Sequence, residues 1–329
     1  MKKTLILTTM VILMIGGSAA NAATLYVNCG AKVGLTSIGA ALKILQRAEA
    51  GEPNTVNVSG VCYEDVVIQS MDHLTLNALN GASITDPSLG ANTAVSIDDS
   101  RDVTVNNFII NGYAPGNSGN DVLDCSDGSV CRLNGNTAQN APQGAGIGIF
   151  AGSFAVITGG MLQNNSFAGL VVANGAKVRA EGVIVQRNSV GVFVNDGGFL
   201  QFASSTSSGN DAQGILARQG GAVICASCIV RGNGFATGSD GILVEQSSSI
   251  VFQHDFGVSP LTDYSVTGNA AKGISLFNLS GVTFNPHGTV TGNASGGLTV
   301  ACNPSFTTAA GLSNAGLIPN SAQTTCVGP

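Results

Sequence analysis

The sequence contains no tryptophan, only four tyrosines among its 329 residues, and few charged side chains, which make up 10% of the total. Proteins that hold sugars by stacking expose large aromatic rings, so this scarcity disfavours a strong carbohydrate-binding module. The formal net charge of -6 excludes binding to nucleic acid, which requires a concentrated basic surface. Glycine is abundant instead, at 45 residues, and the many valines, isoleucines, asparagines, serines and threonines are typical of short strands joined by tight turns.

Long apolar runs are missing from the chain after its first residues. Two lysines precede an apolar run from Leu5 to Ile15, and Ala20-Asn21-Ala22 has the small-x-small form of a signal-peptidase site. We therefore expect residues 1–22 to be a signal peptide, cleaved near Ala22, and the protein to be exported to the periplasm or the cell exterior. The apolar run is too short for a comfortable membrane span, so the chain is not expected to span a membrane.

Eight cysteines fit an oxidising compartment. The "CASC" motif is a poor zinc site, because no second CxxC and no matching histidine pair accompany it. The spacing suggests local disulfides instead, although sequence alone does not fix the connectivity. The suggested pairs are Cys29–Cys62, Cys125–Cys131, Cys225–Cys228 and Cys302–Cys326.

A short pattern recurs along the chain: apolar, any, apolar, five residues, apolar, any, apolar. Between Gly169 and Phe202 it occurs twice, 22 residues apart. A period in the low twenties built of short strands predicts a stacked solenoid. One spacing, of 52 residues, is either two coils or one coil with a long loop around Cys125–Cys131. The inward anchor positions are Ile68, Ile97, Ile149, Val172, Val194, Ala217, Val244, Leu276 and Val300, each followed six residues later by an apolar residue, the last of these being Phe306.

An asparagine stands shortly before the glycine that opens many of the coils. Asparagine and glycine tolerate the left-handed backbone of a sharp corner, and amides stacked from coil to coil can bond one another. The asparagines are Asn165, Asn188, Asn210, Asn269 and Asn293.

This repeat, with the amino-terminal "LYVNCG…TSIGAALKIL…NTVNVSGVCYEDVVIQ", resembles secreted right-handed parallel β-helix proteins of the pectin-lyase-like superfamily. The resemblance implies an all-β, right-handed parallel β-helix of about nine or ten coils, with a short capping helix at residues 38–48. We divide the chain into a signal peptide (1–22), an amino-terminal cap (23–60), the β-helix (61–308) and a tail (309–329) that folds back on it. Many members of the superfamily act on polysaccharides, as lyases, hydrolases, esterases or epimerases, and others only bind or build surfaces.

The sequence motifs of the polygalacturonase-like, pectinesterase-like and epimerase-like members are absent, so the search for chemistry depends on three polar clusters. The first should stack over three coils: Asn195 with Asp196, then Arg218, then Glu245. As a sugar site it would use Glu245 or Asp196 as general acid or base. Surface charges usually pair, which favours a ladder of ion pairs between coils.

The second cluster lies on the turn of one coil and the corner of the coil before it. The predicted register places His73 under Asp102, and a His–Asp pair is a candidate general base, although such surface pairs are more often incidental. The members are Asp72, His73, Asp98, Asp99, Arg101 and Asp102.

The third cluster is the loop "NDVLDCSDG", with Asp121, Asp124 and Asp127. Three acids in seven residues are a candidate calcium site, but the spacing matches no EF-hand, and a solvated loop closed by a disulfide is the simpler interpretation. If this loop folds over the turn at residues 98–102, the two acidic clusters merge, which would be the best single place for a site.

Four outward positions on consecutive coils are apolar, which should not face water. We expect either the tail, tethered by Cys302–Cys326, or another chain (a second copy or a protein partner) to cover them. The four residues are Val171, Phe193, Leu216 and Leu243.

The leading functional hypothesis is a protein that recognises or modifies an extracellular polysaccharide, as a lyase or hydrolase if it is an enzyme. The alternative is a non-catalytic envelope or surface protein. Calcium is the one candidate cofactor. The catalytic candidates are Asp98, Asp99, Asp102, Asp196, Arg218 and Glu245, and the candidate substrate contacts are His73, Tyr113 and Tyr264.

Overall fold

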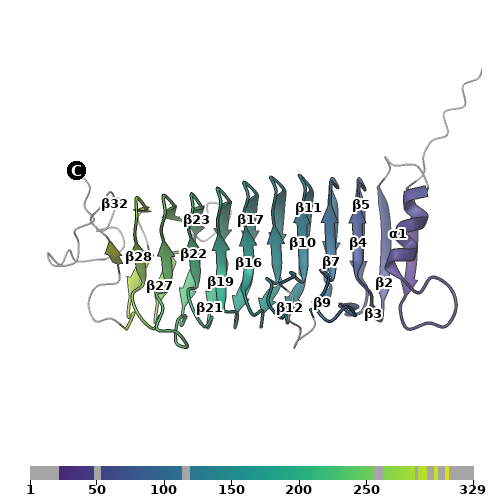
Figure 1. The fold of residues 1–329 in the computed structure, drawn as a ribbon, viewed down its shortest axis with the longest axis horizontal. Coiled ribbons are helices and arrows are strands. Elements are labelled where there is room, and N and C mark those ends of the chain that lie inside the picture. The colour runs from purple at the N-terminus through teal and green to yellow at the C-terminus, as the bar shows by residue number, and fades with distance from the viewer. Residues whose placement is uncertain are drawn as a thin grey trace, which may run out of the picture.

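The computed structural model describes residues 22–47, 53–112, 119–254, 262–285, 288–294, 300–302 and 308–310. Over these residues the chain winds into an elongated solenoid of parallel strands (Figure 1). Residues 1–21 of the predicted signal peptide, Tyr113, Phe306, Cys326 and most of the predicted tail lie outside the described residues.

Three parallel sheets run the length of the solenoid, and each coil contributes one strand to each sheet. Two sheets contain ten strands and one contains twelve, which confirms the predicted β-helix of nine or ten coils. Sheet 1 comprises β1 (Thr24–Asn28), β2 (Asn54–Ser59), β5 (Leu74–Ala78), β8 (Val103–Asn106), β11 (Val130–Asn134), β14 (Phe154–Thr158), β17 (Lys177–Glu181), β20 (Phe199–Ala203), β23 (Ala222–Ala226), β26 (Ser249–Gln253), β29 (Gly281–Phe284) and β32 (Thr308–Ala310).

Within a coil the chain passes from sheet 2 to sheet 1 and then to sheet 3. Sheet 2 comprises β4 (Val66–Gln69), β7 (Val95–Asp98), β10 (Leu123–Ser126), β13 (Ile147–Ile149), β16 (Ala168–Val172), β19 (Val190–Val194), β22 (Ile215–Ala217), β25 (Ile242–Val244), β28 (Ile274–Leu276) and β31 (Val300–Cys302). Sheet 3 comprises β3 (Val61–Tyr63), β6 (Ser83–Thr85), β9 (Ile109–Asn111), β12 (Thr137–Gln139), β15 (Met161–Gln163), β18 (Ile184–Gln186), β21 (Thr206–Ser208), β24 (Ile229–Arg231), β27 (Tyr264–Thr267) and β30 (Gly288–Thr291).

The predicted anchors from Ile68 to Leu276 lie in one buried row of sheet 2, each hydrogen-bonded in register to the next coil. The 52-residue spacing is two coils, because Cys125 fills the missing anchor position between Ile97 and Ile149.

The last anchor was predicted two residues too early. Cys302 pairs with Leu276, and the predicted Val300 pairs with Ile274. The segment at 298–302 contains two overlapping apolar-x-apolar triplets, so the pattern did not distinguish the two registers. In the following strand of sheet 1, Val282 pairs with Ala309, so the predicted position of Phe306 was wrong as well.

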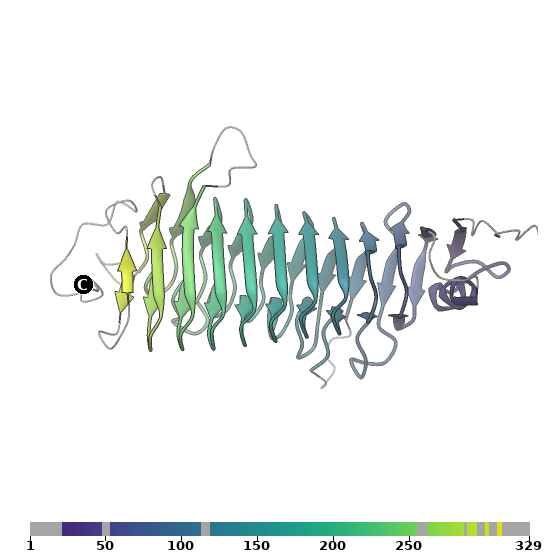
Figure 2. The same ribbon diagram turned by 90° about the horizontal axis from the view of Figure 1, so that it is seen from above.

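A single helix, α1 (Ile38–Arg47), caps the amino-terminal end of the solenoid, as both views show (Figures 1 and 2). Its buried stripe consists of Ile38, Ala41, Leu42 and Leu45, which cover the apolar interior that the first coil would otherwise expose to water. Among the described residues no helix is long and apolar enough to cross a membrane.

A ladder of buried asparagines stabilises the corner between sheets 3 and 2. Asn188, for example, accepts a hydrogen bond from the backbone N–H of Asn165 at 3.0 Å and donates through Nδ2 to the carbonyl oxygen of Leu162 at 3.0 Å. This confirms the predicted stacking of amides. The ladder runs through Asn165, Asn188, Asn210, Asn233, Asn269 and Asn293.

Three of the four suggested disulfides are present: Cys29–Cys62, Cys125–Cys131 and Cys225–Cys228. The fourth involves Cys326, outside the described residues, and stays a prediction. Cys125 and Cys131 occupy two inward positions of one coil and are fully buried, so that bridge is part of the core.

Candidate functional site

A groove of about 470 Å³ lies on the outer face of sheet 2, across the coils that contain β10, β13, β16 and β19. Two rows of corners flank it: the loops that enter sheet 2 from sheet 3, and the turns that leave sheet 2 for sheet 1. Its lining residues are Thr93, Gly119, Asn120, Asp121, Asp124, Phe150, Phe167, Val171, Ala173, Asn174, Phe193, Asn195 and Asp196.

The floor is the outward row of sheet 2. Asp124 pairs with Gly148, Gly148 with Val171, and Val171 with Phe193, so four successive coils place these residues side by side. Because neighbouring strands lie about 4.8 Å apart, the floor runs from a carboxyl group at one end to a benzyl ring at the other over about 14 Å.

Asp124 is the carboxyl group at the first end of the floor. Its Oδ2 accepts a hydrogen bond from the Thr93 hydroxyl at 3.4 Å, and its Oδ1 is buried without a hydrogen-bond partner in the described part of the chain. Loss of hydration, and secondarily the negative charges of Asp98 and Asp121, raise the pKa of Asp124 to about 7. Asp124 is therefore protonated in a large fraction of molecules at neutral pH.

Asp121 stands beside it on the entering loop. Its Oδ1 accepts the backbone N–H of Ala145 at 2.6 Å, and burial raises its pKa to about 6. Asn120 fixes this loop by donating from Nδ2 to the carbonyl oxygens of Gly90 and Ala91, at 3.1 and 2.7 Å. The two carboxyl groups therefore line one cavity, and loss of hydration raises the pKa of both, to about 6 for Asp121 and about 7 for Asp124.

Asp98 lies one coil before Asp124 and supports it from outside the groove lining. Its carboxylate accepts hydrogen bonds from the hydroxyl groups of Ser96 and Ser126, which belong to its own strand and to the next. Asp98 thus keeps both oxygens hydrogen-bonded while its charge acts on Asp124. The predicted loop at residues 120–128 is wrong, because residues 123–126 form strand β10. Asp98 and Asp124 are neighbours through the pairing of β7 with β10, and not because a loop folds over the turn at residues 98–102.

The opposite end of the groove is apolar. Phe167 packs edge-on against Phe193, with ring centroids 5.5 Å apart, and the Arg218 guanidinium lies 4.8 Å from the centroid of the Phe193 ring. Val171 and Phe193 are consequently only 5% and 6% exposed. Neighbouring side chains cover this part of the outward apolar row, which removes the reason for expecting the tail or another chain there, whereas Leu216 and Leu243 remain half-buried.

The first polar cluster is only partly assembled. Asn195 and Asp196 line the groove and bond one another, Nδ2 to Oδ2, at 2.7 Å. Arg218 forms no ion pair among the described residues and contacts Phe193 instead, so the expected ion-pair ladder is wrong at this position. Glu245 occupies the same column one coil further on, outside the groove lining.

The remaining members of the second and third clusters lie away from the groove. Asp102 accepts from Arg132 and lies 3.1 Å from His73 Nδ1, at the start of sheet 1. Asp99 accepts from the Ser70 hydroxyl at 3.1 Å on an exposed turn, and Asp127 is exposed on the next coil. His73 and Asp102 are neighbours on successive coils, as the register predicted. The pair lies away from the groove floor on sheet 2.

Tyr264 is a correction to the list of candidate substrate contacts. It points into the core, fully buried between Phe252 and Phe284, and donates its hydroxyl to the carbonyl oxygen of Asn285 at 3.2 Å. It therefore has no face free for a sugar.

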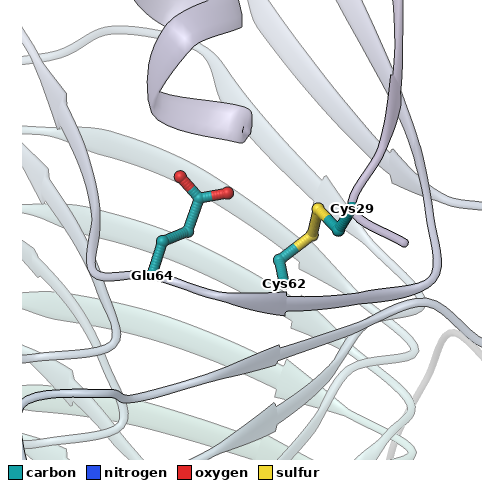
Figure 3. A group of neighbouring side chains, drawn as sticks. All are labelled: Cys29, Cys62 and Glu64. Carbon is teal, nitrogen blue, oxygen red and sulfur yellow. A yellow bond between two sulfur atoms is a disulfide. The ribbon is translucent and has the colours of Figure 1, made fainter. Parts of the chain in front are cut away.

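The described residues contain one group of three potential metal ligands whose atoms lie within 4.8 Å of one another: Cys29, Cys62 and Glu64 (Figure 3). The two cysteines form a disulfide, and Glu64 accepts hydrogen bonds from the backbone N–H groups of Ile38 and Gly39 at the start of α1. This group is a helix cap beside a disulfide. Asp121, Asp124 and Asp127 do not form such a group, and calcium binding there stays a prediction.

Sequence reasoning missed three residues that shape the groove: Gly148, Phe150 and Phe167. Gly148 has no side chain, whereas its neighbours along the floor are Asp124 and Val171, and the Asp121 carboxyl group and the Phe150 ring occupy the space over it. A signal was available, since "GIGIF" places glycine at the outward position of an otherwise apolar triplet.

The central coils match the family described as "Right handed beta helix region", over residues 93–256, about half of the chain. Two similar solved structures are the A-modules of the Azotobacter vinelandii mannuronan C-5 epimerases AlgE6 and AlgE4, each 12% identical to this chain. Their TM-scores are 0.36 and 0.40; the alignments cover 83% of this chain, and 86% and 89% of the respective modules. No curated protein sequence matches the chain.

Proposed function

We propose that this chain, a right-handed parallel β-helix protein, binds a polysaccharide in the groove on sheet 2 and hydrolyses its glycosidic bonds with Asp124 and Asp121. The observation that carries the proposal is the groove itself, in which the carboxyl groups of Asp121 and Asp124 share one cavity with a row of apolar residues. Glycosidases need such a pair of carboxyl groups, one protonated and one ionised.

Asp124 is the proton donor in this proposal. Its carboxyl group, with a pKa of about 7, holds a proton at neutral pH and gives it to the glycosidic oxygen as the bond to the anomeric carbon breaks. Asp121, with a pKa of about 6, is ionised in the same range and takes a proton from the water that attacks the anomeric carbon. Hydrolysis leaves two shorter glycans, one with a new reducing end.

Hydrolysis is favoured over β-elimination by the charges of the lining. A lyase needs a base and a cation to neutralise the uronate carboxylate, and among the described residues no lysine, arginine or histidine lines the groove. The aromatic rings of Phe150 and Phe167, the second of them exposed and packed on Phe193, supply apolar contacts for sugar faces in place of the missing tryptophans.

The test is to incubate the purified protein with a panel of glycans, with and without calcium, and to measure new reducing ends and unsaturated products. We expect reducing ends without unsaturated product, and a loss of about 10²–10⁴-fold in rate for Asp124→Asn and for Asp121→Asn. The matched control is Asp127→Asn, an exposed aspartate of the same segment, which should retain activity.

Turnover that survives Asp124→Asn would overturn the assignment of the proton donor, and absence of turnover and of binding across the panel would overturn the proposed function.

The three disulfides support the further proposal that the protein works in an exported, oxidising location.

A further inference from the structure

The groove has a length that a ligand must match. Asp124 and Phe193 lie three coils apart along the solenoid axis, about 14 Å at the strand spacing of a parallel sheet. One sugar unit of an extended glycan advances by about one coil. A glycan that reaches from the carboxyl end of the floor to the aromatic end therefore needs at least three units, lying along the axis.

In the part of the chain that the structure describes, the ionisable groups that line the groove are all acidic: Asp121, Asp124 and Asp196. Asp98 adds a further carboxylate behind Asp124. The one arginine at the far end, Arg218, has its guanidinium over the Phe193 ring and its Nε buried. An anionic ligand would meet like charge at the carboxyl end of the floor, from Asp121 and Asp124, and again at the wall, from Asp196, which costs binding energy.

The remaining polar groups of the lining are neutral. Thr93, Asn174 and Asn195 offer hydroxyl and amide groups, the kind of partner that sugar hydroxyls bind. Between them the floor and walls are apolar, through Val171 and the three phenylalanines. A glycan presents hydroxyl groups at the edges of its sugar rings and apolar C–H groups on the ring faces, so it matches both the neutral polar groups and the apolar surface of the groove.

We infer that the groove selects an uncharged glycan of at least three sugar units, bound along the solenoid axis, and disfavours polyuronates. This inference rests on the proposed polysaccharide function and adds to it the charge and the minimum length of the substrate.

The experiment measures binding by calorimetry with the Asp124→Asn variant, which retains the groove without turning over its ligand. The probes are neutral oligosaccharides of two to six units from cellulose, xylan, mannan and β-glucan, and oligogalacturonates and oligomannuronates of the same lengths. At pH 8 and low salt we expect a neutral series to bind, with an affinity that rises about tenfold from dimer to trimer and then levels off. Uronates should bind at least about tenfold more weakly than the best neutral series.

A charge variant separates selection by charge from selection by shape. Asp196→Asn should raise the affinity for uronates several-fold relative to the affinity for neutral glycans, whereas Asp211→Asn, an exposed aspartate outside the groove lining, should leave this ratio unchanged. Tighter binding of uronates than of neutral glycans would overturn the charge inference while the polysaccharide function stands. Equal affinity for dimers and trimers would overturn the length inference. Absence of binding by every probe would overturn both the inference and the proposed function.

Discussion

The carboxyl group of Asp121 lies directly over the backbone of Gly148. A methyl group at position 148 would stand 2.1 Å from Asp121 Oδ2 and 2.3 Å from Cε2 of Phe150. The space over Gly148 is therefore filled by the Asp121 carboxyl group and the Phe150 ring, which cover the floor at this coil because the residue there has no side chain.

Gly148→Ala should damage the site more than the fold. The new methyl group displaces Asp121 or the Phe150 ring, so we expect a loss of at least about tenfold in glycan binding and turnover, with a destabilisation of about 1–3 kcal/mol. Thermal unfolding and glycan binding measure the two effects on one sample.

The control for this substitution is Gly30→Ala. A methyl group at Gly30 meets only Asn28 Oδ1, at the ordinary contact distance of 3.7 Å, so stability and binding should both stay near wild type. Normal glycan binding by Gly148→Ala would contradict the idea that Asp121 and Phe150 keep their positions only because residue 148 has no side chain.

Asp124→Asn should stabilise the protein at high pH. The pKa of Asp124 rises from 3.8 to about 7 on folding, so the native state binds the proton more tightly than the unfolded chain. The free energy of unfolding therefore falls as pH rises from about 4 to about 7, and the isosteric amide removes this loss. We expect a gain of about 2–4 kcal/mol at pH 8 and none at pH 4.

Denaturant titrations at several pH values measure this difference, with Asp127→Asn as the exposed control. A gain that is the same at pH 4 and pH 8 would contradict the idea that burial of the charged form causes it.

The period of the coils was predictable because every coil needs apolar side chains of similar volume at the same inward positions. Each inward position, from Ile68 to Leu276, must fill a fixed slot in a stack of strands, so the requirement repeats in the sequence with the coil. The asparagine ladder was predictable for the same reason, since each amide bonds its counterpart one coil away.

The groove was not predictable in the same way. Its walls are corners, whose length varies from coil to coil, and the sequence does not show that the Asp121 side chain covers Gly148. Arg218 illustrates the limit: charge alternation with Asp196 and Glu245 predicted an ion pair, whereas the Phe193 ring, one coil away, competes for the guanidinium. Which neighbour a surface arginine contacts depends on side-chain packing that a linear pattern does not specify.

Asn188→Ala should be strongly destabilising. The substitution leaves the buried N–H and Nδ2 of Asn165 without their acceptor and removes the donor to the Leu162 carbonyl. Each unsatisfied buried polar group costs about 1–3 kcal/mol, so we expect a loss of about 2–5 kcal/mol by denaturant titration. Gln201→Ala, on the outward face of β20, is the control and should cost little; similar costs for the two would contradict a structural role of the ladder.

Glu64→Gln should loosen the helix cap. The Glu64 carboxylate accepts from Ser37 Oγ at 2.8 Å and from the N–H groups of Ile38 and Gly39 at 2.7 and 3.0 Å, and it faces the positive end of α1. Glutamine keeps one acceptor and loses the charge, so we expect a loss of about 1 kcal/mol and faster amide exchange in α1. Binding of zinc or calcium that depends on Glu64 would contradict the assignment of this group as a cap.

The pH dependence of turnover tests the paired carboxyl groups and the part played by Asp98. Asp121 must be ionised and Asp124 protonated, so kcat/KM should fall below about pH 6 and above about pH 7, as the apparent pKa values of a coupled pair. The charge of Asp98 helps to raise the pKa of Asp124, so Asp98→Asn should move the alkaline limb to lower pH while the acid limb stays near its place. Asp99→Asn, which alters an exposed neighbour hydrogen-bonded to Ser70, should move neither limb. If Asp98 had only a structural role, Asp98→Asn would lower turnover equally at all pH values. An alkaline limb that stays in place in Asp98→Asn would therefore contradict the electrostatic coupling between Asp98 on β7 and Asp124 on β10.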